Sequence, residues 1–211
     1  MSMMIILLGF LWYQFISVLG LSIGLHRYFA HKQFSYKYMS SFMETVTLFL
    51  SLLAGSRSPL GWIGAHRIHH RYSDTNKDPH SPLHKGFLKV LFNQWKVRNI
   101  PMRYVRDLYD NKRIMFFHNY WLYIWSIAGL VTLMVSWKFF FIFVVSPFVY
   151  GFLSFGIFNA LGHSNGKPVT NHFINLLSGG EGPHDVHHKN SKQIKLSKYD
   201  ISGIIIEKCL R

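Results

Sequence analysis

An apolar N-terminal segment is the feature that most constrains how this chain can fold. No charged side chain occurs before Arg27, and residues 3–25 are nearly all apolar. A helix of roughly 20 such residues crosses the hydrocarbon core of a bilayer. A secretory signal peptide would instead need a basic start and a small-residue cleavage site, and neither is present. We therefore expect a retained transmembrane helix over residues 3–25.

Two further apolar runs, residues 120–137 and 139–161, are separated only by a short polar interruption. This spacing predicts a tight transmembrane hairpin. Residues 39–63 form a weaker candidate, because this segment contains Glu44, Arg57 and many serines and threonines. If it crossed the membrane, the histidine clusters on its two sides would lie on opposite faces. We therefore predict an interfacial or re-entrant helix there.

The basic residues indicate which side of the membrane the remaining segments occupy. The chain has 23 Lys and Arg against 9 Asp and Glu, a formal net charge of +14. Such a surplus can indicate nucleic-acid binding, but only 15% of the residues are charged and 49% are hydrophobic. With the predicted hairpin, only Lys138 faces the far side, so the positive-inside rule places residues 26–38, 64–118 and 162–211 in the cytoplasm. The surplus is therefore explained by topology, with no nucleic-acid partner.

No repeat, low-complexity tract or linker divides the chain, so residues 1–211 are expected to form one domain. The predicted fold class is an all-α integral membrane protein. It has about three transmembrane helices, the interfacial or re-entrant helix and a cytoplasmic helical cap. The single cysteine excludes an internal disulfide framework and any cysteine-based metal cage.

Histidine is abundant, with 13 residues, and most of them are clustered. The clusters read HRYFAH, HRIHH, NALGH and HDVHH. They contain nine histidines, each near a predicted membrane boundary or in a short cytoplasmic segment: His26, His31, His66, His69, His70, His163, His184, His187 and His188. The other four lack partners at ligand spacing and are interpreted as loop or interface residues: His80, His84, His118 and His172.

The spacing of the clusters favours a metal site. In a helix, the three histidines of His-x-x-His-His project from one side, and Asn159 and His163 also share a face. His26 and His31 are five residues apart and can converge only where the helix ends or bends. Imidazole suits iron, zinc, copper or nickel. Nine ligands exceed the needs of one ion and suit two, with an open position that a water held by Asn159 could fill. Two redox-active metals with open positions suit the activation of O₂.

One other enzyme class is excluded by counting, and a second has no support in the sequence. Soluble di-iron carboxylate proteins need four glutamates on helices, whereas this chain has three in all, Glu44, Glu181 and Glu207. Nucleophilic hydrolases of the G-x-S-x-G type have no matching motif, and the only thiol is Cys209 near the C-terminus. The run Gly179 to Gly182 is interpreted as a turn that presents the last histidine cluster.

In order and context, the motifs HRYFAH, HRIHHRYSDTNKDPHSPLHKGF, NALGH and GGEGPHDVHH resemble the membrane fatty acid desaturases of the Δ9, stearoyl-type class. The likeness is greater to the bacterial and cyanobacterial branch than to the animal one. It implies that the nine clustered histidines bind two ferrous ions and that Asn159 holds a metal-bound water. It also implies a bent tunnel for the acyl chain beneath the cap, with O₂ as co-substrate and a cis double bond, at Δ9, as product.

The resemblance also implies partners. The substrate is a fatty acyl chain on coenzyme A, on acyl carrier protein or in a membrane lipid, and the reducing electrons come from a separate ferredoxin or cytochrome b5. Carboxylates beside the histidine clusters could orient the ligands: Asp74, Asp78, Glu181 and Asp185. Aromatic residues of the last apolar run could line the path of the acyl chain: Phe148, Tyr150, Phe152, Phe155 and Phe158. A histidine-box alkane or lipid hydroxylase and a non-catalytic membrane metal-binding relative are the alternatives.

Three features depart from the pattern of the family. The helical hairpin that usually precedes the first histidine cluster is missing, which oligomerisation or lipid could offset. The Arg-Asp pair that precedes HRxHH in animal enzymes is Gly64-Ala65 here, which removes one reason to expect a coenzyme A substrate. The usual Ser-His-x-Gly-Trp that follows the DPH segment is replaced by residues 88–95.

Overall fold

The protein is described from a computed structural model, in which residues 2–211 are placed. Three of its helices are long and apolar enough to cross a membrane: Met3–Ala30, Lys112–Val135 and Trp137–Leu161. The first is α1 (Met3–Ile16) continued without a break by the π-helix η1 (Ser17–Ala30). The predicted helical membrane fold with about three spanning segments is confirmed.

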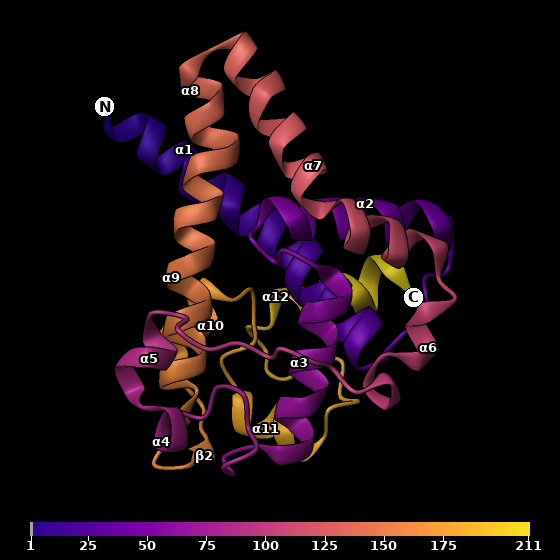
Figure 1. Cartoon of the computed structure of the whole chain (residues 1–211), viewed down its shortest axis with the longest axis vertical. Coiled ribbons are helices and arrows are strands. Elements are labelled where there is room, and N and C mark those ends of the chain that lie inside the picture. Colours follow the sequence, from indigo (N-terminus) through magenta and orange to yellow (C-terminus); the bar gives the residue numbers. More distant parts are fainter. Residues whose placement is uncertain (1) are drawn as a thin grey trace.

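The second and third spans form the predicted hairpin (Figure 1). The first arm is α7 (Lys112–Val135), and the second joins α8 (Trp137–Phe140), η3 (Phe141–Val145) and α9 (Ser146–Leu161). Between the arms, Ser136 leaves the helical conformation and caps the second arm, since its Oγ accepts from the Phe139 amide at 3.3 Å. Helix α7 begins several residues before the apolar run that predicts it, because Asn111 caps it through the amides of Arg113 and Ile114.

Residues 39–63 contain two helices where one was expected. Helix α2 (Ser40–Leu53) ends before a loop over residues 54–58, and α3 (Pro59–Tyr72) begins after it. At about 1.5 Å per residue, the 14 residues of α2 span about 21 Å, less than the roughly 30 Å of a bilayer core. Helix α2 packs closely on η1, where a Cβ on Gly24 would lie 2.7 Å from the Thr47 Cβ.

The other elements form a cap at the end of the membrane helices that is remote from the hairpin turn (Figure 1). It consists of short helices, long loops and one antiparallel pair of two-residue strands, which the all-helical prediction did not include. Its elements are α4 (Pro82–Lys85), α5 (Phe87–Leu91), η2 (Met102–Tyr104), α6 (Arg106–Tyr109), β1 (His163–Ser164), β2 (Lys167–Pro168), α10 (His172–Leu177), α11 (His184–Lys189), α12 (Ile201–Ile205) and η4 (Ile206–Leu210). Helix α3 reaches from the membrane helices into this cap.

Candidate metal centre

All nine clustered histidines come together where η1 and α3 meet the cap, and they form two groups. The five-histidine group consists of His26, His31, His66, His70 and His187. The four-histidine group consists of His69, His163, His184 and His188. Within each group, one ring nitrogen of every member lies within 4.8 Å of the others. The spacing of the clusters in the sequence did not predict how the nine histidines divide between the two groups.

Each His-x-x-His-His triplet contributes to both groups. His66 and His70 of α3 belong to the five-histidine group, whereas His69 belongs to the other. Helix α11 shows the reverse arrangement, because His184 and His188 belong to the four-histidine group and His187 to the five. At 100° per residue, positions i and i+4 are nearly aligned, and i+3 points about 100° away from i+4. The two helices therefore bridge both groups and fix their separation.

The π-helix explains how His26 and His31 meet. Both lie at the end of η1, where the His31 amide donates to the carbonyl of His26 at 3.0 Å. This bond spans five residues, the π-helical pattern, so the two side chains lie on one face although an α-helix would separate them. Their rings are 4.8 Å apart between centroids.

The ring nitrogens within each group are arranged as a cation would require. In the five-histidine group, the Nε2 atoms of His26 and His187 are 3.0 Å apart, and those of His31 and His66 are 2.8 Å apart. In the four-histidine group, the Nε2 atoms of His163 and His184 are 2.9 Å apart. A neutral imidazole whose Nδ1 donates a proton has only a lone pair on Nε2. Several such lone pairs pointing at one another repel unless a proton or a metal ion lies between them.

Carboxylates lie beside the outer nitrogens of three of these rings and are hydrogen-bonded to two of them, those of His69 and His163. The Nδ1 of His69 lies 3.0 Å from both oxygens of Asp78, and the Nδ1 of His163 lies 2.8 Å from Asp74. The Nδ1 of His26 lies 3.2 Å from Glu181. Such partners fix the tautomer and the orientation of a ligating imidazole. Among residues 2–211, Asp185, the fourth candidate, forms no hydrogen bond or ion pair with a histidine. It accepts a hydrogen bond from the Thr170 hydroxyl and forms an ion pair with Lys189.

Glu181 belongs to a buried ion network that joins the C-terminal segment to η1. Arg27 has no solvent exposure. Its Nε donates to Glu181 at 2.8 Å, its Nη2 donates to Asp200 at 3.0 Å, and its Nη1 donates to the Ile194 carbonyl. Burial alone would raise the pKa of Glu181, but Arg27 and His26 hold that pKa well below its usual value. Glu181 therefore stays ionised beside His26.

Burial lowers the pKa of several histidines in the two groups. It lowers the pKa of His69 and His184 well below the ordinary value, and neighbouring imidazoles lower it further. The pKa of His188 falls to about 3 for the same reasons. A neutral imidazole is the form that binds a metal ion, so the environment suits the donor set.

His80 corrects the interpretation of the four isolated histidines. It does lie in a loop, but it is buried, and its ring stacks on His69 with centroids 4.2 Å apart. Its amide donates to Asp78 at 3.0 Å, so the Asp-Pro-His sequence forms an Asx turn. The Asp-Pro-His turn close to HRIHH is the sequence signal that could have placed His80 beside the clustered histidines. The other three also lie outside both groups, but on helices and not in loops: His84 on α4, His118 on α7 and His172 at the start of α10.

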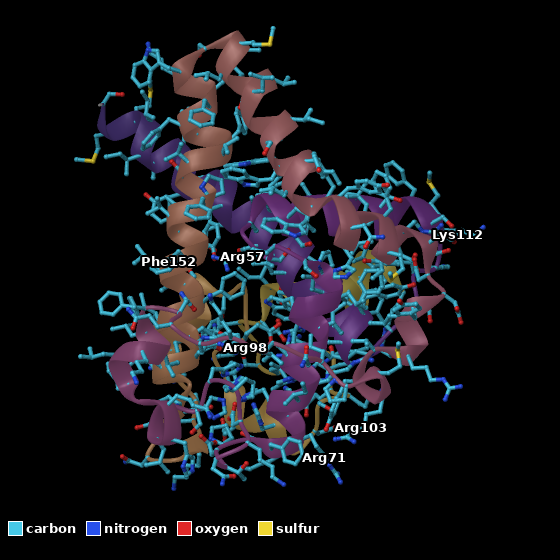
Figure 2. All side chains as sticks on the ribbon, in the orientation of Figure 1. Arg57, Arg71, Arg98, Arg103, Lys112 and Phe152 are labelled. Carbon is cyan, nitrogen blue, oxygen red and sulfur yellow. The ribbon has the colours of Figure 1, made fainter. Side chains whose placement is uncertain are left out.

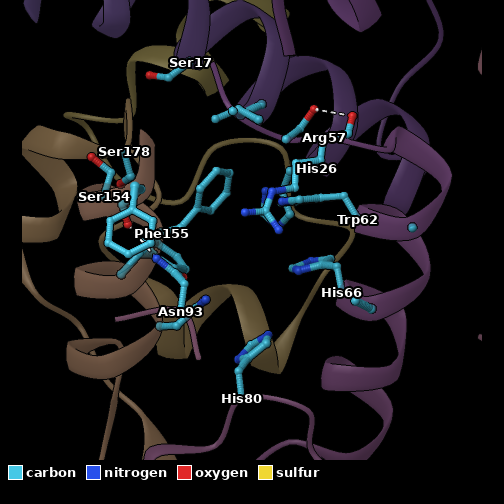
Figure 3. Close-up of a pocket in the computed structure, with 18 of the residues that line it drawn as sticks. Ser17, His26, Arg57, Trp62, His66, His80, Asn93, Ser154, Phe155 and Ser178 are labelled. Atoms are coloured by element: carbon cyan, nitrogen blue, oxygen red, sulfur yellow. Dashed lines mark hydrogen bonds between the residues drawn. The ribbon is translucent and has the colours of Figure 1, made fainter. Parts of the chain in front are cut away.

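A cavity of about 520 Å³ extends from the membrane helices to the histidines. Tyr13 and Leu21 line its membrane side, and His26, His66 and Asn159 line its cap side. Figure 3 shows His26, Trp62 and His66 across the cavity from Phe155 and Ser154. Of the five predicted aromatic residues, Tyr150 does not line the cavity and instead packs on Phe10 and Tyr13. The remaining four do line it: Phe148, Phe152, Phe155 and Phe158.

No protein-family model matches the chain. Among curated proteins, it is 31% identical over 195 residues to an sn-1 stearoyl-lipid 9-desaturase from Synechocystis sp., which covers 86% of this chain and 60% of the relative. An enzyme of the same name from Anabaena variabilis is 27% identical, covering 81% and 66%. An acyl-CoA Delta(11) desaturase from Trichoplusia ni is 26% identical, covering 82% and 55%. The chain therefore spans a little over half to two thirds of these relatives, and over most of its own length it is homologous to the membrane fatty acid desaturases.

Proposed function

We propose that this protein is an O₂-dependent fatty acyl desaturase that introduces a cis double bond, at Δ9, into a saturated acyl chain. One observation carries the proposal. Two groups of buried or half-buried histidines lie side by side, and His26 and His66 of the five-histidine group line a largely apolar cavity that extends between the membrane helices. An acyl chain could thus reach from the bilayer to a pair of metal ions without crossing water. The names of the relatives support the same chemistry.

The nine histidines would hold two iron ions, and Asn159 would hold a water bound to one of them. When bound, the iron pair supplies the oxidising power that removes two hydrogens from neighbouring methylenes with O₂ as co-substrate. The protein's own task is positioning, since reacting atoms must be held roughly 3–3.5 Å apart. The Trp62 ring stacks on the His66 ring with centroids 5.1 Å apart, and both residues line the cavity. An acyl chain in the cavity would therefore pack against Trp62 beside His66.

Topology and partners complete the proposal. The positive-inside rule places the cap in the cytoplasm. The structure described here has no cysteine cluster, because Cys209 is the only thiol, so a separate ferredoxin or cytochrome b5 would supply electrons. The acyl carrier would be a membrane lipid, coenzyme A or acyl carrier protein, and the protein could form oligomers.

Expression in a bacterium that supplies ferredoxin tests the proposal, with total fatty acids analysed by mass spectrometry that locates double bonds. New cis-monoenes are expected from the wild type and from His172→Ala, an exposed histidine outside both groups. They should be absent with His69→Ala. Hydroxylated products would instead identify a hydroxylase. An unchanged profile from inserted, iron-loaded protein would contradict the proposed activity.

A further inference from the structure

Arg67 lies inside the HRIHH motif of α3, between two histidines of the five-histidine group, and its side chain binds the end of η1. Its Nη2 donates to the carbonyl of Phe29 at 2.7 Å, and its Nε donates to that of Ala30 at 2.9 Å. These two residues directly precede His31. A side chain of the second histidine cluster therefore holds the backbone that carries the end of the first.

The guanidinium of Arg67 uses all five of its N–H groups. The other three donate to the Tyr104 carbonyl at 2.9 Å and to the two carboxylate oxygens of Asp107 at 2.6 and 3.1 Å. Because the guanidinium is planar and its donors have fixed directions, five simultaneous bonds hold the group in one position. Tyr104 and Asp107 belong to the segment that leads into α7. Arg67 thus fixes η1, α3 and this segment relative to one another.

The carbonyls at the end of η1 are closed by basic side chains. The last carbonyls of a helix have no N–H donor within the helix and carry a partial negative charge, which cations stabilise. Arg67 binds the carbonyls of the last two residues of η1, and the Lys192 ammonium donates to the next two, those of His31 and Lys32. Lys192 follows α11, the helix of the last histidine cluster. The end of η1 is therefore held from the regions of both other clusters.

His31 is the histidine whose position depends most directly on these contacts. Its Nε2 lies 2.8 Å from the Nε2 of His66 and 3.2 Å from that of His187, and its ring centroid is 4.5 Å from that of His70. All four belong to the five-histidine group. The members of the four-histidine group lie on α3, β1 and α11. A displaced end of η1 would therefore disturb the first group and leave the second in place.

We propose that Arg67 is a positioning residue for the five-histidine metal site, where it holds the end of η1 so that the His31 imidazole faces His66 and His70. Lys192 supports the same backbone. The proposal rests on the histidines binding two metal ions, as the proposed function requires. Loss of Arg67 should weaken metal binding at this one group by about 10–100-fold, the usual effect of removing a group that orients a metal ligand.

The metal affinity of single-site proteins tests this proposal without turnover. His163→Ala with His188→Ala leaves only the five-histidine group complete, and His26→Ala with His70→Ala leaves only the four-histidine group complete. The Fe²⁺ affinity of each protein is measured by competition with a chelator, with and without Arg67→Gln. This change should weaken binding about 10–100-fold in the first protein and leave the affinity of the second unchanged. A general loss of structure would weaken both alike.

Three further variants sharpen the test in the same two proteins. Arg67→Lys should recover part of the affinity, because it restores the charge but not the five hydrogen bonds. Lys192→Gln changes an exposed side chain, so it should weaken the five-histidine group even if Arg67→Gln does not fold. Arg71→Gln is the matched control and should change neither affinity. Arg71 lies on the same helix and is exposed, and Figure 2 shows it at the edge of the molecule.

The outcomes separate the positioning role from the proposed activity. An equal loss in both single-site proteins, no loss in either Arg67→Gln or Lys192→Gln, or an equal loss in Arg71→Gln would overturn the proposal. A wild type that binds no iron would overturn both the positioning role and the proposed function. The predicted change in affinity without desaturation would refute the proposed activity alone. Desaturation with affinities that do not depend on Arg67 would refute the positioning role alone.

Discussion

Replacing Arg27 by methionine should destabilise the protein strongly, because Arg27 is the only cation in the buried network of Glu181 and Asp200. Arg27 and Asp200 have no solvent exposure and Glu181 is 5% exposed, so the change leaves two buried carboxylates without a counter-charge. Removing one partner of a buried ion pair costs about 3–5 kcal/mol. For a chain of this length, each kcal/mol lowers the unfolding midpoint by about 2–4 °C, so we expect a loss of roughly 6–20 °C.

The assay is thermal unfolding in detergent, followed by tryptophan fluorescence. Lys32→Met is the matched control. The Lys32 side chain also pairs with a carboxylate, Asp107 at 2.6 Å, but it is 55% exposed, and exposed pairs contribute about 0–1 kcal/mol. Arg27→Lys retains the positive charge but cannot donate to both carboxylates as the guanidinium does. Its unfolding midpoint should therefore lie between those of Arg27→Met and Lys32→Met. If Arg27→Met shifts the midpoint no more than Lys32→Met does, the network is not a determinant of stability.

Three further predictions concern a histidine partner, the contact between α5 and α9, and the effect of metal on stability. Asp78→Asn should weaken metal binding by about 10–100-fold, because Asp78 orients the His69 ring through its Nδ1. A competition titration with a chelator measures the affinity, and an unchanged value would show that Asp78 does not orient His69 for metal binding. Gly156→Ala should cost about 1–3 kcal/mol, because the added Cβ would overlap the Leu91 carbonyl and displace α5 from α9. Gly129→Ala is the matched control, because Gly129 is also helical and the atom nearest to its added Cβ, Phe140 Cε2, lies 3.4 Å away; an equal midpoint shift in both variants would contradict the predicted overlap. Metal removal should lower the unfolding midpoint, because a site held at 100 times its Kd contributes about 2.7 kcal/mol; identical midpoints with and without chelator would mean that the metal does not bind preferentially to the folded state.

Much of the fold and the site could be predicted from the sequence because both depend on strong local signals. Apolar length identifies the helices Met3–Ala30 and Trp137–Leu161, and the His-x-x-His-His spacing identifies ligands that share a helix. These signals need only the helical period and the thickness of a bilayer. The helix break over residues 54–58 also has sequence signals, a glycine at position 55 and a proline at position 59. Because apolar residues continue on both sides of the break, the segment was predicted as one helix.

The remaining features depend on contacts between distant segments. The distribution of His69 and His187 to opposite groups depends on how α3 faces α11, which no single helix encodes. The π-helix that joins His26 to His31 is a tertiary outcome, since η1 is held by the close packing of α2 and by the partners of Arg27. The sequence pattern thus identified the histidines that come together, and the packing of four segments determined which of them share a group.

The number of metal ions per chain tests the central conclusion most directly. Iron in purified, iron-loaded protein is measured by mass spectrometry, together with His70→Ala from the five-histidine group, His188→Ala from the four-histidine group and the exposed control His172→Ala. Two independent sites predict about two ions per chain in the wild type and in His172→Ala, and about one in each of the other two variants. A single ion per wild-type chain, or no loss of iron in either ligand variant, would contradict the division of the histidines into two metal-binding groups.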